Sequence, residues 1–237
     1  NTLDKLYGGQ SQITYGIGGT NLIHKVGEPI GAVYDYEFAG IWHLEEATQA
    51  AAFGQRPGQV KVTDVNGDGK ITADDRKVIG QVTPKWTGGI TNTLNYKNFD
   101  FSFFVNISQG NIFKSNFHGW SWSDTPTRTF NGFKADYWTP ERQSDGWHQP
   151  GNGGTYANAE YYKDVSFVKV GYITLGYKLP TGILDKLKIS GLRLYATVQN
   201  PFVFTKYDGW DPENAGRDQF GAAFMSRTFM TGLNLSF

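Results

Sequence analysis

The chain has no cysteine, no excess of charge and no long apolar segment, and each absence excludes a class of protein. Without cysteine there is no disulfide framework, no zinc–thiolate centre and no thiol nucleophile. The 22 basic and 22 acidic side chains give a formal net charge of zero, which removes the electrostatic basis for binding nucleic acid. No stretch approaches the roughly 18 consecutive apolar residues of a transmembrane helix. Nucleophile-elbow, P-loop and dinucleotide-binding strings are also missing, so we assign no catalytic residue and expect no enzyme activity.

Aromatic residues and glycine are abundant instead. Aromatic side chains make up 16% of the 237 residues, and there are 30 glycines. The mean hydropathy is nevertheless −0.44, which is typical of a water-soluble chain. A membrane β-barrel combines these properties, because its strands are apolar only at alternate residues and its aromatics gather at the two membrane interfaces. A soluble all-β domain with aromatic ligand sites fits the composition equally well.

Alternation of apolar and polar residues is the dominant local pattern. In the segment 99–108 the odd positions are apolar and the even positions are polar, with the single exception of Phe104. The preceding segment 86–96 alternates in the same way, and Lys97 and Asn98 separate the two, which predicts a β-hairpin. Further strands are expected at 172–179, 192–199 and 229–237, with weaker signals at 12–17 and 32–42. A helical turn is expected at 183–187.

Short links between these strands alternate with long ones. The long links are 44–83, 110–161 and 201–223, and compact soluble domains rarely carry structureless loops of that length. Outer-membrane barrels do so routinely, with short periplasmic turns and long extracellular loops. The sequence therefore predicts an all-β fold: about seven strands of a large antiparallel transmembrane β-barrel with long extracellular loops.

A typical bacterial barrel closes with an even number of strands, at least about eight, so seven strands cannot close one. An open sheet in lipid would leave unpaired edge groups that cost several kcal/mol each. We therefore expect the remaining strands to come from an N-terminal portion outside this chain, and the first residue, Asn1, fits removal of a preceding segment.

The segment 64–75, DVNGDGKITADD, follows the pattern of a calcium-binding loop. Calcium takes six to eight oxygen ligands, and such loops place a glycine at the sixth position, here Gly69, where the chain turns sharply. The expected ligands are Asp64, Asn66, Asp68, the carbonyl of Lys70, Thr72 through water, and Asp75. Aspartate at the twelfth position is shorter than the glutamate of helical EF-hands and is typical of dockerin-like loops. We expect a structural Ca²⁺ in an extracellular loop; the alternative is a set of Asx-turns without an ion.

Tryptophans in the predicted loops are candidates for contact with a ligand or a partner protein. They are Trp120, Trp122, Trp147 and Trp210, together with Trp138. Indole rings stack on sugars, but they also pack loops together or form the interfacial aromatic girdle, and the sequence leaves these readings open.

The four histidines are expected to be structural or solvated. They are His24, His43, His118 and His148, and no pair among them has the spacing of metal ligands.

Five segments together resemble a known family in their order and spacing. They are VGEPIGAVYDYEFAGIW (26–42), DVNGDGKITADDRKVIG (64–80), PKWTGGITNTLNYKNFDFSFFVNISQGN (84–111), YKDVSFVKVGYITLGYKLP (162–180) and LRLYATVQNPFVFTKYDGWDPE (192–213). The chain resembles the C-terminal third of SusC/RagA-type TonB-dependent outer-membrane transporters over nearly its whole length.

The resemblance implies a barrel of about 22 strands with an N-terminal plug. It implies uptake of glycans or peptides across the bacterial outer membrane, with energy from TonB and a SusD-like surface lipoprotein as partner. Residues 1–237 would form part of the barrel wall and its loops, in contact with lipid, and would not transport by themselves. A secreted calcium-dependent carbohydrate-binding β-sandwich is the alternative, and a glycoside hydrolase is a third reading that no residue supports.

Overall fold

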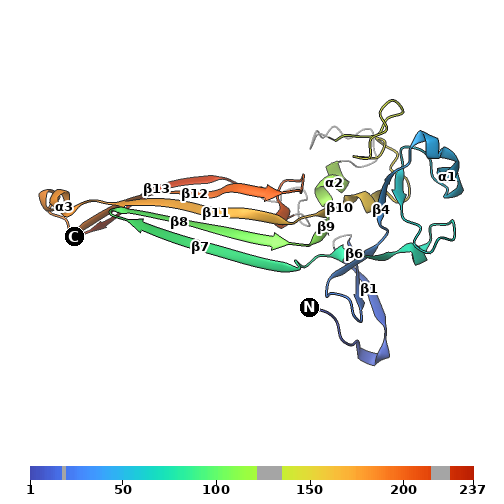
Figure 1. Cartoon of the computed structure of the whole chain (residues 1–237), viewed down its shortest axis with the longest axis horizontal. Coiled ribbons are helices and arrows are strands. Elements are labelled where there is room, and N and C mark those ends of the chain that lie inside the picture. Colours follow the sequence, from blue (N-terminus) through green and yellow to red (C-terminus); the bar gives the residue numbers. More distant parts are fainter. Residues whose placement is uncertain (18–19, 122–134, 215–224) are drawn as a thin grey trace. The chain divides into compact units, whose positions relative to one another are not determined.

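The computed structural model describes residues 1–17, 20–121, 135–214 and 225–237 (Figure 1). Two compact units emerge from its contacts. The first comprises Asn1–Thr83, Gly110–Val165 and Tyr207–Ala223, and the second comprises Pro84–Gln109, Ser166–Lys206 and Phe224–Phe237. The structure is mostly β-strand with few helices, which confirms the all-β prediction. The helices in the described ranges are too short or too polar for any of them to span a bilayer.

The second unit is one five-stranded antiparallel sheet with the order β13-β12-β11-β8-β7 (Figure 1). Its strands are β7 (Trp86–Tyr96), β8 (Phe99–Gln109), β11 (Phe167–Lys178), β12 (Gly191–Thr205) and β13 (Thr228–Ser236). The turn of the predicted hairpin contains Lys97 with a φ of 52°. Helix α3 (Thr181–Leu187) connects β11 to β12, as the sequence predicts.

Strand register separates an apolar face of this sheet from a polar face. One row across the strands is Leu94, Phe101, Leu175, Ala196 and Thr231. The adjacent row points to the other side, because side chains alternate between faces along a strand. That row is Thr93, Ser102, Thr174, Thr197 and Met230, and the hydroxyls of its two central threonines lie 2.8 Å apart. The alternation of apolar and polar residues in the sequence thus places the apolar side chains on one face of the sheet.

The exposed residues of the apolar face are large. They include Ile90, Leu94, Phe99, Leu175, Phe204, Phe229 and Leu233, with exposed fractions between 48% and 73%. Water is an unfavourable surrounding for so much apolar surface, at about 25 cal/mol per Å².

Phe104 breaks the alternation because its ring lies on the polar face. It stacks against Tyr172 with ring centroids 6.1 Å apart. Two glycines make room for it: a Cβ on Gly171 would lie 2.8 Å from Phe104 Cδ1, and one on Gly89 would lie 3.2 Å from Cε2. The register of β11 shifts between Val170 and Tyr172, which is a β-bulge at Gly171.

The first unit contains three smaller sheets. The largest has the order β1-β2-β3-β6 and is built from β1 (Gln12–Ile17), β2 (Thr20–Lys25), β3 (Ala32–Asp35) and β6 (Lys77–Gln81). The others pair β4 (Phe38–Ile41) with β5 (Val60–Val62), and β9 (Ile112–Lys114) with β10 (Tyr162–Asp164).

Short helices complete the first unit. The α-helices are α1 (Ala47–Ala52) and α2 (Asn116–Ser121). The 3-10 turns are η1 (Tyr7–Gly9), η2 (Leu44–Glu46), η3 (Ala73–Asp75), η4 (Ala157–Tyr161) and η5 (Pro212–Asn214).

Distant segments share the hydrophobic core of this unit. Ile41, Val60, Val62, Trp138, Ala157 and Ala159 form one buried cluster, against which Tyr36, Ile71 and Tyr156 pack. A smaller cluster joins Val165 and Tyr207, with Phe113 packed on it.

Three details of the predicted organisation are wrong. The weak strand at 12–17 is confirmed as β1, but the weak strand at 32–42 is two strands, β3 and β4, in different sheets, and all three lie in the first unit. The long links are not structureless, because they contain β5, β6 and β9 and part of the buried core. The link expected from residue 201 begins inside β12, which continues to Thr205. Pro201 is tolerated there because Asn200, with a φ of 50°, and Pro201 lie opposite the bulge in β11.

Candidate functional site

The predicted calcium loop adopts a tight turn held by its own side chains. Asp64 accepts hydrogen bonds from the backbone N–H groups of Gly67 (2.8 Å) and Gly69 (2.9 Å). The N–H of Lys70 donates to Asp68 at 2.8 Å. Gly69 has a φ of 77°, a conformation that favours glycine, so its expected turning role is confirmed.

Asp75 closes the loop from its last position. Its side chain is fully buried, and one carboxylate oxygen accepts hydrogen bonds from the N–H groups of Val65 (3.0 Å) and Asn66 (3.4 Å). The other oxygen accepts from the N–H of Thr72 at 2.7 Å. These backbone donors, that of Thr72 first, hold the pKa of Asp75 below its ordinary value. The twelfth residue is thereby anchored to the second and third.

Whether this donor set suits calcium depends on which oxygens can turn toward an ion. The chemistry of the set fits, since carboxylate, amide and carbonyl oxygens are the ligands that calcium prefers. In the present arrangement, however, Asp64 and Asp68 are directed at backbone donors, as in Asx-turns. Across the described residues, no three His, Cys, Asp or Glu side chains converge in a metal-binding arrangement. Calcium binding by Asp64, Asn66, Asp68, Lys70, Thr72 and Asp75 stays a prediction.

The tryptophans divide into buried and exposed positions. Trp138 and Trp147 are 2% and 4% exposed, and the ring of Trp147 stacks on His118 at 5.2 Å between centroids. Trp210 is 38% exposed and lies 4.8 Å from the ring of Phe117. Packing between segments therefore accounts for the two buried rings, while Trp210 offers its surface to solvent. Trp122 and the side chain of Trp120 lie outside the described residues.

Two histidines occupy buried polar sites that could not be predicted from their spacing in the sequence. His118 is fully buried, with Nδ1 2.7 Å from Ser115 Oγ and Nε2 2.9 Å from Asp208 Oδ1. The His118 imidazole is the main cause that lowers the pKa of Asp208. His148 is also fully buried, and its Nδ1 lies 2.5 Å from Glu160 Oε2. These are structural pairs, as expected for histidines without metal-ligand spacing.

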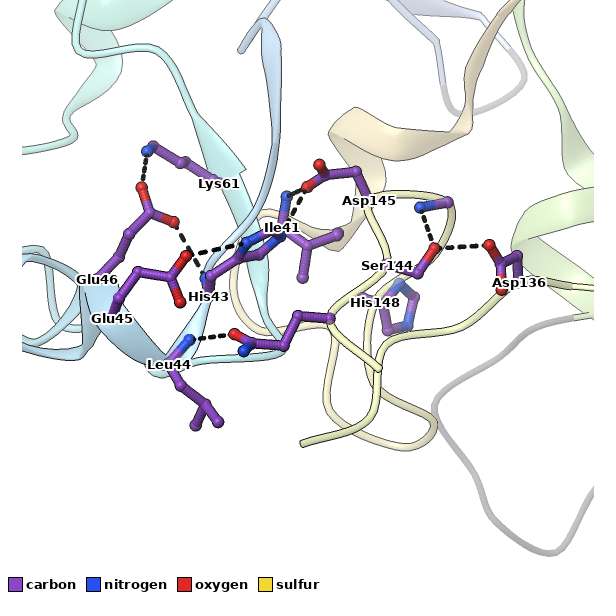
Figure 2. A network of polar contacts seen from close by, with 12 residues as sticks. Ile41, His43, Leu44, Glu45, Glu46, Lys61, Asp136, Ser144, Asp145 and His148 are labelled. Atoms are coloured by element: carbon purple, nitrogen blue, oxygen red, sulfur yellow. Dashed lines mark hydrogen bonds and ion pairs between the residues drawn. The ribbon is translucent and has the colours of Figure 1, made fainter. Parts of the chain in front are cut away.

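A polar network joins the end of β4 to residues about a hundred positions later (Figure 2). One carboxylate oxygen of Asp145 accepts a hydrogen bond from the N–H of Ile41 and lies 3.2 Å from His43 Nε2. The N–H of Leu44 donates to the side chain of Gln143 at 2.6 Å. Residues of two predicted loops are thus fixed to each other within one folded unit.

Comparison with known proteins agrees with the resemblance read from the sequence. No family model matches the chain. It is 32% identical over 231 residues to "TonB-dependent receptor P3" of Formosa agariphila, an alignment that covers 91% of this chain and 23% of that protein. It is 28% identical over 247 residues to "TonB-dependent receptor SusC" of Bacteroides thetaiotaomicron, covering 100% of this chain and 23% of that protein. The chain belongs to the TonB-dependent receptor family. It spans about a quarter of the length of these receptors.

Solved structures support the fold of this receptor chain. It aligns over its whole length with 26% of a chain in the structure of the RagAB peptide transporter, with a TM-score of 0.75 and 24% identity. A second alignment, to the RagAB peptide importer in the "open-open" state, has a TM-score of 0.72 and 23% identity over 25% of that chain.

Proposed function

We propose that this chain forms part of the barrel wall and the extracellular loops of a TonB-dependent outer-membrane importer. The observation that carries the proposal is the apolar, exposed face of the five-stranded sheet, opposite a polar face. A strand needs about 9–11 residues to cross the hydrocarbon layer of a membrane. Strands β7, β8 and β13 have that length, with 11, 11 and 9 residues. Lipid on the apolar side and water on the polar side would suit both faces.

The edges of this sheet support a larger assembly. In the part of the sheet that the structure describes, β7 and β13 are the outer strands, each hydrogen-bonded to one neighbour. Unpaired backbone groups in lipid cost several kcal/mol each, so a membrane sheet must close. The rest of the receptor, which in the relatives is about three times as long as this chain, would supply the missing strands and the plug.

In this proposal, the class of nutrient and the partner proteins are inferred from related transporters. The two aligned structures are described as a peptide transporter and a peptide importer, and one relative is named SusC. We infer an importer of peptides or glycans that works with a SusD-like surface lipoprotein and draws energy through TonB. The ordered first unit, with Trp210 exposed, would provide loop surface for these contacts.

Cysteine labelling tests the proposed membrane face, because residues 1–237 contain no cysteine and any cysteine elsewhere in the full-length receptor can first be replaced. Leu94 and Thr93 are adjacent, both exposed, and lie on opposite faces of β7. In the full-length receptor in vesicles, Leu94→Cys should resist a water-soluble maleimide and react with a lipid-soluble one, while Thr93→Cys should show the reverse. Equal reaction of both variants with the water-soluble reagent would refute the membrane assignment.

A further inference from the structure

A polar cavity of about 300 Å³ lies within the first unit. Its lining includes Asp35, Tyr36, Arg76, Lys114, Tyr156 and Asn158. These residues come from the end of β3, the residue after the calcium loop, β9 and the η4 region. Only the fold brings them together, since they lie up to about 120 positions apart in the sequence.

The carboxylate of Asp35 is engaged by neutral donors. One oxygen accepts hydrogen bonds from Asn21 Nδ2 (2.8 Å) and the Tyr162 hydroxyl (2.7 Å), and the other accepts from the N–H of Tyr36 (2.9 Å). Burial first, and then Asp35, raise the pKa of Tyr162, so this phenol stays protonated and keeps donating. Asp35 therefore has three donors of its own and does not need the cations of the cavity as partners.

Two cationic side chains line the same space. The Nε of Arg76 is buried and has no hydrogen-bond partner among the described residues, while its guanidinium carbon lies 5.0 Å from the ring centre of Tyr36. Arg76 also lines a neighbouring cavity of about 180 Å³. A buried N–H donor without an acceptor costs about 1–3 kcal/mol, and a ligand oxygen would remove that cost.

Charge in the cavity favours a monoanion. Arg76 and Lys114 bring two positive charges and Asp35 brings one negative charge, which leaves one positive charge in excess. Burial lowers the pKa of Lys114, and the Asp35 carboxylate opposes that change. A second carboxylate would stabilise the ammonium group further, whereas a dianion would leave a net negative charge buried without compensation.

The walls of the cavity are suited to a flat or ring-shaped group. The rings of Tyr36 and Tyr156 meet edge to face at 5.0 Å between centroids. At about 30 Å³ per water, 300 Å³ holds roughly ten water molecules, which is enough for one sugar ring or one amino acid.

We propose that this cavity binds the carboxylate of an acidic sugar or an amino acid, with the planar guanidinium of Arg76 and the ammonium of Lys114 as its charge partners. The guanidinium fork matches the two oxygens of a carboxylate, and the tyrosine rings pack against the rest of the ligand. The inference goes beyond the proposed function, because it concerns binding and holds whether or not the ligand is transported.

Calorimetry on the purified full-length receptor tests this with two matched pairs of probes. Glucuronate is compared with glucose, and N-acetylglycine with N-acetylglycinamide, so each pair differs in one carboxylate that the neutral partner lacks. At least one acidic probe should bind about tenfold or more tightly than its neutral partner, as expected for a charge-assisted hydrogen bond. The pair that responds identifies the source as sugar or amino acid, and the absence of any difference in both pairs would overturn the proposal.

Variants locate the binding within the unit. Arg76→Gln should remove the preference for the acidic probe, and Arg76→Lys should keep part of it, since it keeps the charge but loses the planar fork. The matched control is Arg142→Gln, because Arg142 is 73% exposed, pairs with Asp136 and does not line the cavity. If Arg76→Gln does not fold, Arg76→Lys and Lys114→Gln still test whether the acidic probe binds in this cavity. If these two folded variants prefer the acidic probe as strongly as the parent receptor does, the proposed site is refuted.

Discussion

Placing one arginine at different depths of the apolar face gives the sharpest test of the membrane assignment. Ile90 is the fifth of the 11 residues of β7 and is 56% exposed on the apolar face. Four steps of about 3.4 Å put it about 14 Å along the strand. With a strand tilt of about 35–45°, that is about 10–11 Å of depth, near the middle of an apolar band about 25 Å tall.

Ile90→Arg should therefore destabilise the folded receptor by about 2–4 kcal/mol, the cost of arginine near the bilayer midplane. Tyr96 ends the same strand on the same face, so Tyr96→Arg should cost only about 0–1 kcal/mol. Thr91 is adjacent to Ile90 but points to the polar face, and Thr91→Arg is the matched control. We expect the order Ile90→Arg, Tyr96→Arg, Thr91→Arg in loss of stability.

The assay is the temperature at which the full-length receptor in lipid vesicles loses its heat-modifiable migration on gels. Stability differences of 2–4 kcal/mol are large against a total of about 5–15 kcal/mol for typical domains, so the shift should be measurable. Equal losses for Ile90→Arg and Thr91→Arg would mean that both faces have the same surroundings, which would refute the reasoning.

Three further predictions concern the loop, the bulge and the carboxylate–histidine pair Asp208–His118. Asp64→Ala combined with Asp68→Ala should abolish calcium binding by the full-length receptor and increase loop mobility, measured by calcium titration and hydrogen exchange. Gly171→Ala should cost about 1–3 kcal/mol, because its Cβ would lie 2.8 Å from Phe104, and Phe104→Leu should recover part of that loss in thermal unfolding. The pKa of Asp208 is lowered in the fold, so its contribution is present at neutral pH and is lost as the pH falls through that lowered pKa. Asp208→Asn should accordingly lose about 1 kcal/mol at neutral pH, and less in acid, in urea unfolding, the size being limited by solvent screening of this half-exposed group.

Each of these has a result that contradicts it. Asp74 is exposed and is not among the expected ligands, so Asp74→Ala should leave calcium binding intact, and a parent receptor that binds no calcium would defeat the loop prediction. An additive Gly171→Ala and Phe104→Leu pair would show that the two residues do not clash. A loss for Asp208→Asn that is the same at neutral and acidic pH would show that its ionisation does not contribute.

Sequence patterns predicted the five-stranded sheet because its strands of 9–15 residues are long enough for alternation to be read. Four of the strands that were not predicted, β5, β6, β9 and β10, have three to five residues, which is too short for a period to stand out, and the six-residue β2 lacks alternation, since Leu22 and Ile23 are adjacent. The turn chemistry of residues 64–75 was also visible, since aspartate, asparagine and glycine hydrogen-bond within a few residues. Local signals thus fixed the sheet and the loop.

The buried polar sites could not be predicted in that way. His148 and Glu160 are 12 positions apart, and the Asp35–Tyr162 hydrogen bond joins residues 127 positions apart. No local pattern marks such partners, because the contact is made only when separate segments pack into one core. The isolated Nε of Arg76 is likewise a property of the fold, since an arginine after an acidic loop looks solvated in sequence.

The loop and the cavity share one short piece of backbone, which makes their two proposed ligands interdependent. Arg76 directly follows Asp75, the residue that closes the loop, and the Tyr156 hydroxyl donates to the carbonyl of Ile71 at 3.3 Å. Calcium bound by residues 64–75 would restrict both of these cavity residues before a carboxylate arrives, so less ordering entropy would be lost on binding. Linkage requires the two effects to be equal. A carboxylate ligand must strengthen calcium binding by the same factor by which calcium strengthens the binding of the carboxylate. Calcium in the loop and a carboxylate in the cavity would thereby each bind more tightly when the other is present.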